Sequence, residues 1–342
     1  MMRELCYALE GCARRGLMQA IFSFACLTLS LTVEAQGTDP ALLAQSQRQC
    51  RNCLGGHRFL PASNISDPFV TTHFISSTGG GSASGLTMPV RNIQGQVVDS
   101  LEGDIAFFGL GFEYQYAPIK WLALRATASA NGRVGTSAQS VVASGVSALY
   151  GFSLGGTARV WQKSSFIVSI GGDFQRNTEY DVDPFGFVRA VVRDGLTDTT
   201  RGALLTDVLL NRYSIGPRAA WAPYAWLGIV GVLDFGSAEV PQDDGTEDYE
   251  SVTGYALQSS VDFRRMSSVP IGLSLGWRGQ SGPGRVASLG GTVSTWAAGL
   301  FYTGRAGFVI GGEVTSSRVE VSEPDVPKLS SVLGRLVTRI EF

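Results

Sequence analysis

Two histidines and two closely spaced cysteines are the residues of this sequence that could most directly carry out chemistry. Nucleophilic catalysis needs a base within hydrogen-bond reach of a nucleophile, and His57 and His73 are the only histidines. His73 lies among hydroxyl residues in TTHFISS, whereas His57 precedes every predicted strand. Neither belongs to a lipase or protease motif, and no residues have the spacing of metal ligands. We therefore predict no enzyme, no metal and no cofactor, with a hydrolase as a minor alternative.

The cysteines Cys50 and Cys53 form the motif CRNC. A redox-active pair would need a thioredoxin-like βαβ context, and haem attachment needs a histidine directly after the second cysteine, where Leu54 stands. In an oxidising compartment a local disulfide is the simplest interpretation. We predict a Cys50–Cys53 disulfide.

Charged side chains within alternating runs are a larger set with a possible function. In each run, the charged residues occupy the alternate positions that the bulky apolar residues do not, and Arg212 and Glu341 follow the same rule. Two interpretations remain open: charge rows that set the selectivity of a polar lumen, or mutual ion pairs that fill a closed interior. The candidates for lining the lumen are Glu113, Arg125, Arg159, Asp173, Arg218, Asp234, Asp262, Arg278, Glu313, Arg335 and Arg339.

The elements that position these charges are long strands. In the stretch 103–130, apolar or aromatic residues occupy every second position on each side of the short connection APIK, which predicts two antiparallel strands. Phe108, Leu110 and Phe112 are predicted to face lipid. About twelve such runs follow Phe69, most of them longer than the roughly 5 or 6 residues of a water-soluble strand.

The connections between the runs alternate in length. Short ones such as APIK and GRAG separate long ones such as 177–209, and tryptophans border several short turns. Short turns on one side and long loops on the other are typical of transmembrane barrels, and interfacial tryptophans fit the same class better than a water-soluble β-sandwich. We predict an all-β fold: a transmembrane antiparallel up-and-down β-barrel of 12 strands, with a bulge at Pro217.

The ends of the chain suggest three segments. Arg14 and Arg15 precede an apolar run that ends near Ala35, as in a secretory signal. We predict a signal peptide at 1–35, a periplasmic or plug-like segment with the CxxC motif at 36–67, and the barrel at 68–342. With 16% charged residues and a net charge of −2, the chain is not predicted to bind nucleic acid.

The longest loop carries a predicted helix. Asp183 can cap it and Pro184 suits its first position. A lid over the barrel mouth and a packed loop that only seals the barrel are both open. The apolar stripe of this predicted lid consists of Phe187, Val188, Val191 and Val192.

The C-terminal run GRLVTRIEF ends in Phe342. It resembles the C-terminal signal strand of Gram-negative outer-membrane β-barrel proteins, which end in an aromatic residue. The resemblance implies location in the cell outer membrane, contact with outer-membrane lipid, and recognition of Phe342 by the barrel-assembly machinery. It implies no substrate.

The predicted function is a channel or transporter for small molecules, with partly hydrophobic molecules among the candidates. The alternatives are a structural or adhesive outer-membrane barrel, whose acidic loop 241–250 could bind a partner, and, less favoured, an outer-membrane hydrolase.

Overall fold

The computed structural model describes residues 52–91, 97–135, 146–182, 205–241, 247–267, 269–282, 291–321 and 329–342. All of them belong to one compact unit, Ala44–Phe342. The predicted signal peptide, the helix after Asp183 and its apolar stripe lie outside these ranges.

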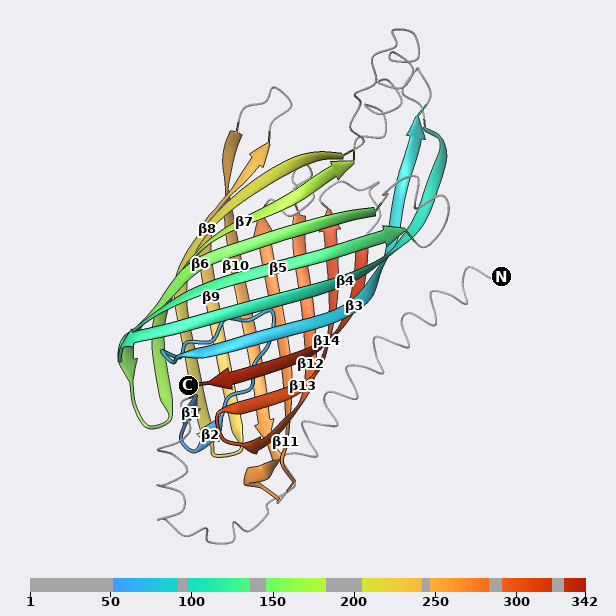
Figure 1. The fold of residues 1–342 in the computed structure, drawn as a ribbon. Helices are drawn as coiled ribbons and strands as arrows, with labels where there is room; N and C mark the ends of the chain where they lie inside the picture. Colours follow the sequence, from blue (N-terminus) through green and yellow to red (C-terminus); the bar gives the residue numbers. More distant parts are fainter. Residues whose placement is uncertain are drawn as a thin grey trace. The chain divides into compact units, whose positions relative to one another are not determined.

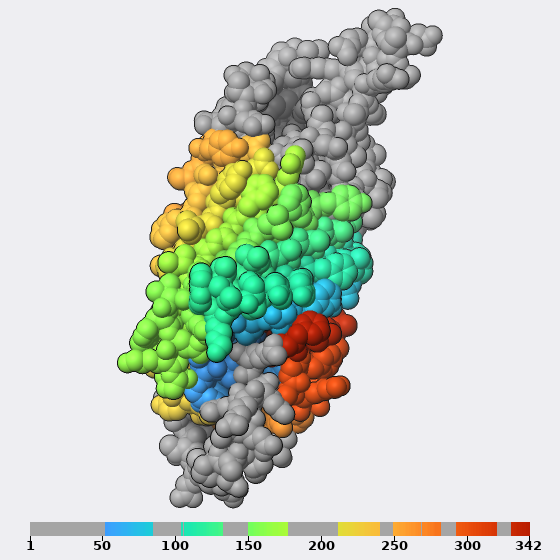
Figure 2. All heavy atoms as spheres, turned by 60° about the vertical axis from the view of Figure 1, so that its left-hand side comes forward, coloured from blue at the N-terminus to red at the C-terminus, as the bar shows by residue number. Residues whose placement is uncertain are grey.

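Twelve strands form a closed barrel in which every neighbouring pair is antiparallel (Figure 1). The last strand pairs with the first, so the C-terminal strand, in red, lies beside β3, in blue (Figure 2). The predicted fold and strand number are confirmed. The barrel strands are β3 (His73–Arg91), β4 (Val97–Ile119), β5 (Leu122–Gly135), β6 (Val146–Gln162), β7 (Phe166–Val182), β8 (Leu205–Tyr224), β9 (Leu227–Pro241), β10 (Glu247–Asp262), β11 (Ile271–Gly282), β12 (Gly291–Arg305), β13 (Phe308–Val321) and β14 (Leu329–Glu341).

The strands extend further than the sequence predicted. β3 begins at His73, later than the first predicted run, and continues through the glycine-rich stretch at positions 79–81. The glycines fit here because β3 lies close to β14: a Cβ atom at Gly79 would collide with the carbonyl oxygen of Gly334. Close approach of two backbones is a known reason for glycine within a strand.

The outer face of the barrel is apolar. Phe108, Leu110 and Phe112, predicted to face lipid, are 55%, 41% and 49% exposed. Near the short turns, Trp121 and Trp161 are also exposed, as expected for an interfacial aromatic belt. Among the described residues, no helix is long and apolar enough to span a membrane.

A positive charge on this outer face is expected to destabilise the barrel. Leu154 is 55% exposed near the middle of β6, and Leu154→Arg should cost about 2–4 kcal/mol, as arginine does at the lipid midplane of a barrel. Ser129→Arg, on the neighbouring strand but facing the interior, is the matched control and should cost less than about 1 kcal/mol, because a lumen side chain can stay hydrated. Urea unfolding in lipid vesicles measures both, and equal costs would contradict the assignment of faces.

Pro217 does not mark the predicted bulge. Its strand β8 pairs with β9 in one register on both sides of it, Ile215 with Phe235 and Arg218 with Val232. Proline has no N–H to donate, so the ladder toward β9 skips this position without a shift. The irregularity between these strands lies instead between Trp221 and Tyr224, next to the short turn.

The chain before the barrel folds back into its interior (Figure 1). This segment, Asn52–Thr72, contains the small hairpin of β1 (Cys53–Leu54) and β2 (His57–Arg58), and an isolated bridge between Ala62 and Ile65. We call Asn52–Thr72 the inner segment and Ala62–Ile65 its tip. Its apolar side chains pack against inward-facing residues of the wall; the cluster comprises Leu54, Phe59, Ile65, Phe69, Ile167, Ala220, Ala222, Val230 and Val232.

Candidate functional site

A buried ion-pair cluster belongs to the barrel wall alone. Asp173 on β7 lies 2.5 Å from Arg125 on β5 and 2.6 Å from Arg218 on β8. Arg218 also donates a 3.1 Å hydrogen bond to the Thr157 hydroxyl. Glycines on the intervening positions make room: a Cβ atom at Gly171 would collide with the Arg218 guanidinium. One carboxylate is thus shared by two arginines, which leaves this cluster with an excess positive charge.

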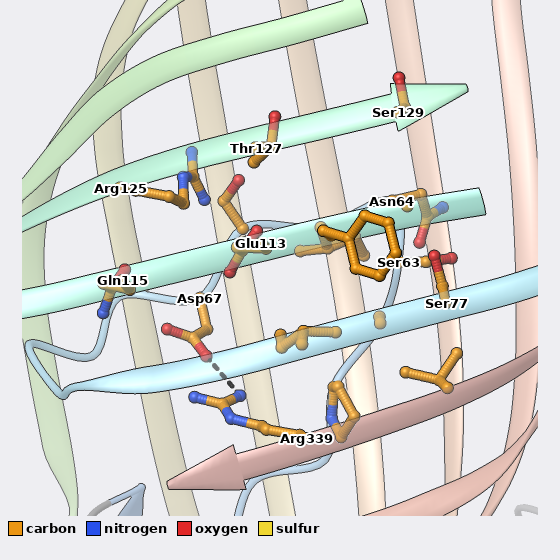
Figure 3. Close-up of a pocket in the computed structure, with 18 of the residues that line it drawn as sticks. Ser63, Asn64, Asp67, Ser77, Glu113, Gln115, Arg125, Thr127, Ser129 and Arg339 are labelled. Atoms are coloured by element: carbon orange, nitrogen blue, oxygen red, sulfur yellow. Dashed lines mark hydrogen bonds and ion pairs between the residues drawn. The ribbon is translucent and has the colours of Figure 1, made fainter. Parts of the chain in front are cut away.

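A second cluster joins the wall to the inner segment. Arg339 on β14, 1% exposed, lies 2.8 Å from Asp67 and 3.5 Å from Glu341 (Figure 3). His73, at the start of β3, has Nε2 3.0 Å from Glu113 and Nδ1 3.3 Å from Arg339. Burial alone would raise the pKa of Asp67, but the Arg339 guanidinium outweighs it and holds that pKa below its usual range. Asp67 is therefore ionised at neutral pH and ties the inner segment to the wall.

The tip has its own contacts with the wall. Glu313 on β13 accepts hydrogen bonds from the hydroxyl and the backbone N–H of Ser63. Arg278 on β11 donates a 2.9 Å hydrogen bond to the carbonyl of Asn64 and lies 3.9 Å from Asp234. The deepest part of the inner segment is therefore fixed by charged side chains that the sequence analysis assigned to the lumen.

Neutral side chains of the wall also bind the inner segment through its backbone. Gln115 donates to the carbonyls of Phe69 and Thr71, both at 2.9 Å. Gln258 donates to the carbonyl of Leu60 at 2.9 Å. The sequence analysis did not identify these glutamines. Their position showed only that a polar side chain faces the interior, and that does not tell whether the side chain contacts the inner segment or water.

The remaining predicted lumen residues lie at different depths. Arg159 lies at the short-turn end of β6, where it donates to the carbonyl of Lys120 and the side chain of Gln162. Asp262 caps the 3-10 turn η1 (Phe263–Arg265) and accepts a 3.0 Å hydrogen bond from Thr303. Arg335 faces the interior and lines the cavity described next.

A polar cavity of about 290 Å³ lies beside the tip (Figure 3). Its floor is the inner segment, including Ser63, Asn64 and Asp67. Its wall comes from strands on both sides of the pairing between β3 and β14, and from strands across the lumen. We call it the tip cavity. Charged, amide and hydroxyl side chains of the wall that line it are Ser77, Glu113, Gln115, Arg125, Thr127, Ser129, Ser153, Gln175, Gln258, Arg278, Arg335 and Arg339.

The structure brings His57 to a hydroxyl group that sequence reasoning did not pair with it. His57 Nε2 lies 2.8 Å from the Ser260 hydroxyl on β10. Both residues are buried, His57 fully and Ser260 at 2% exposed, so no substrate reaches the pair. Burial lowers the pKa of His57 to about 3, which makes the imidazole a poor general base near pH 7. The arrangement is that of a packed contact between the inner segment and the wall.

Three further sequence predictions concern a disulfide, an assembly signal and a metal site. Cys53 is disulfide-bonded; its partner lies outside the described residues, so the pairing with Cys50 stays a prediction. The side chain of Phe342 is 55% exposed and its N–H donates to the carbonyl of Thr72 at 3.0 Å, while its role as an assembly signal stays a prediction. No cluster of three possible metal ligands occurs among the residues that the structure describes.

The closed antiparallel barrel, its apolar outer face and its polar interior define an outer-membrane β-barrel protein. In this class short turns face the periplasm, which puts the inner segment in the periplasmic half of the lumen and the tip cavity on its outer side.

No protein-family model and no curated protein matches the chain. Solved structures with a similar fold include an outer-membrane channel from Pseudomonas putida F1, with 10% identity, a TM-score of 0.49, and coverage of 83% of this chain and 100% of the other. The translocator domain of the autotransporter NalP from Neisseria meningitidis has 11% identity, a TM-score of 0.44, and coverage of 81% and 90%. The Pseudomonas putida toluene transporter TodX has 10% identity, a TM-score of 0.39, and coverage of 86% and 97%. Similarities this weak assign no substrate to this chain.

Proposed function

We propose that this protein is an outer-membrane channel for small polar molecules, and that the inner segment is the gate that closes its periplasmic half. One observation carries the proposal: a polar lumen is occupied, from its short-turn end to the level of Glu313 and Arg278, by a segment of the same chain. A barrel that was only structural would need no polar cavity on the outer side of the segment.

The way in which the inner segment is held supports a movable gate. It adds no strand to the barrel ladder; its β1 pairs only with its own β2. Its polar contacts with the wall are mostly side-chain bonds, such as Asp67 to Arg339 and Gln258 to the Leu60 carbonyl. Such contacts can break while every strand of the barrel keeps its partners. The connection at Thr72 to β3 keeps the segment attached when they do.

The polar lining also bears on the class of permeant. Arginines, carboxylates, amides and hydroxyls outnumber the apolar side chains that line the tip cavity, such as Leu60, Ile65 and Val337, and covering polar groups with an apolar molecule carries a cost. We therefore infer polar permeants. The predicted apolar lid at Phe187–Val192 lies outside the described residues and does not support a hydrophobic permeant. Of the predicted acidic loop 241–250, residues 242–246 lie outside the described residues, while Pro241 ends β9 and Glu247 begins β10, so the loop is shorter than predicted and does not support an adhesive role.

Removal of the gate should open the pore. A chain that starts at Gln36 and lacks residues 50–67 is expected to give stepwise single-channel currents in a planar bilayer, whereas the same chain with the segment intact should stay closed for most of the time. The deletion also removes both cysteines of the predicted disulfide, so no free thiol is left.

Heat-dependent migration in gels verifies that both forms are folded barrels. A folded deletion variant that conducts no ions would contradict the channel, and equal conductance of the two forms would contradict the gate.

A further inference from the structure

We propose that the tip cavity binds a small polyhydroxylated molecule that carries one carboxylate, a sugar acid in chemical terms. The inference deepens the proposed function, on which it rests for the route by which the ligand leaves toward the periplasm. Binding itself requires only the closed state that the structure shows, with the inner segment in place as the floor of the site.

The volume sets the size of the ligand. Small-molecule sites have volumes of about 300–1,000 Å³, and the tip cavity, at about 290 Å³, is at the lower end. It therefore suits a monosaccharide or a molecule of similar size. The cavity is also mostly surrounded by polar side chains that the barrel wall holds in place, which is the arrangement that gives a polar ligand a fixed orientation.

An unpaired amide points to hydrogen-bonding groups on the ligand. Both side-chain atoms of Asn64, its donor and its acceptor, are buried without a hydrogen-bond partner in the protein. Leaving a buried polar group unsatisfied costs about 1–3 kcal/mol. A ligand hydroxyl satisfies either atom, since it both donates and accepts. The hydroxyls of Ser77, Thr127 and Ser129 also line the cavity (Figure 3), so several ligand hydroxyls find partners.

The charge of the lining favours an anion. The two carboxylates that line the cavity are already engaged, Asp67 with Arg339 and Glu113 with His73. Arg125 has to share Asp173 with Arg218, and its Nε is buried without a hydrogen-bond partner. The lining itself contains four arginines, Arg125, Arg278, Arg335 and Arg339. The carboxylates Asp173, Asp234 and Glu341, which pair with three of them, lie outside the cavity lining.

Arg278 is the arginine best placed to take the negative group. Its closest described carboxylate, Asp234, is 3.9 Å away, at the limit of an ion pair. One oxygen of Asp234 is buried without a hydrogen-bond partner, so the pair with Arg278 is a weak one. A guanidinium presents a planar fork that matches a carboxylate, and the carboxylate of a ligand would complete the coordination of Arg278 while its hydroxyls bind Asn64.

Calorimetric titration of the refolded chain from Gln36 onward tests this assignment with three probes: glucuronate, glucose and glucosamine. They share a ring of similar size and hydroxyl pattern and differ in charge. We expect glucuronate to bind at least tenfold more tightly than glucose, and glucosamine to bind most weakly. Arg278→Gln should remove the preference for glucuronate. Asn64→Ala, which removes an amide that has no partner in the fold, should weaken glucuronate and glucose alike.

Arg159→Gln is the matched control, because this arginine lies at the short-turn rim and not in the tip cavity; it should leave all three affinities unchanged. Absence of binding by every probe, a preference for glucosamine, or a glucuronate affinity insensitive to Arg278→Gln and Asn64→Ala would each overturn the assignment. These outcomes are independent of the gate: a closed barrel that binds glucuronate but never conducts would contradict the channel alone.

Discussion

Replacement of Asp173 by asparagine should lower the free energy of unfolding by about 3–5 kcal/mol, the usual cost of removing one partner from a buried ion pair. The carboxylate of Asp173 lies between Arg125 and Arg218, which are 8% and 1% exposed. Without it, two guanidinium groups face each other with no anion between them. Asparagine has the same shape, so the loss reports charge and not packing. Urea unfolding in lipid vesicles measures the change.

The control for this prediction removes all three charges together. A triple variant, Arg125→Met, Asp173→Leu and Arg218→Met, should recover most of the stability, because apolar replacement of a whole buried ion cluster is often neutral or stabilising. A change of less than about 1 kcal/mol for Asp173→Asn would mean that water enters the lumen and hydrates the arginines, contrary to their burial. That result would also favour charge rows over mutual pairing as the role of the lumen charges.

The second large effect is expected from loosening the gate without shortening it. Asp67 and Ser63 hold the inner segment through hydrogen bonds to the charged groups of Arg339 and Glu313. Hydrogen bonds to charged groups contribute about 1.5–3 kcal/mol each. Losing both in Asp67→Ala/Ser63→Ala should shift the equilibrium between closed and open states by about 100-fold or more, since about 1.4 kcal/mol is a factor of ten.

Open probability in single-channel records measures this shift, and the barrel wall is unchanged in the variant. Ser66→Ala provides a matched substitution in the same segment, because neither contact depends on Ser66, and should leave the open probability as it is. A double variant that remains closed would show that the contacts left in place, which are the apolar packing of the segment and the hydrogen bonds from Gln115, Gln258 and Arg278, are enough to hold it.

The barrel could be predicted from the sequence because a membrane acts on every strand in the same way. Lipid excludes charge from one parity, so Arg218 and Glu313 could be assigned to the interior from their neighbours alone. No comparable rule applies within the interior. Whether an inward arginine binds a wall carboxylate, as Arg218 does, or the backbone of a returning segment, as Arg278 does, depends on which strands face each other across the lumen.

The inner segment shows the same limit more strongly. It has no alternating pattern, because its contacts are irregular: Ser63 binds Glu313, and His57 binds Ser260, more than 200 positions along the chain. Its sequence left open both a plug and a periplasmic cap. The extent of β3 is hard to predict for a related reason: glycines are typical of loops, but those at 79–81 lie within the strand and serve its close contact with β14.

That contact has a consequence for how the molecule is made. The seam between β3 and β14 can form only when synthesis has reached the last strand, and the inner segment is bound to the β14 side of it: Asn52 to Glu341, Asp67 to Arg339, and Thr72 to the N–H of Phe342. Loops of this length are slow to close. The contacts of the inner segment with β14 can therefore form only once the last strand has been made, so that closure of the lumen by this segment is among the last events of assembly.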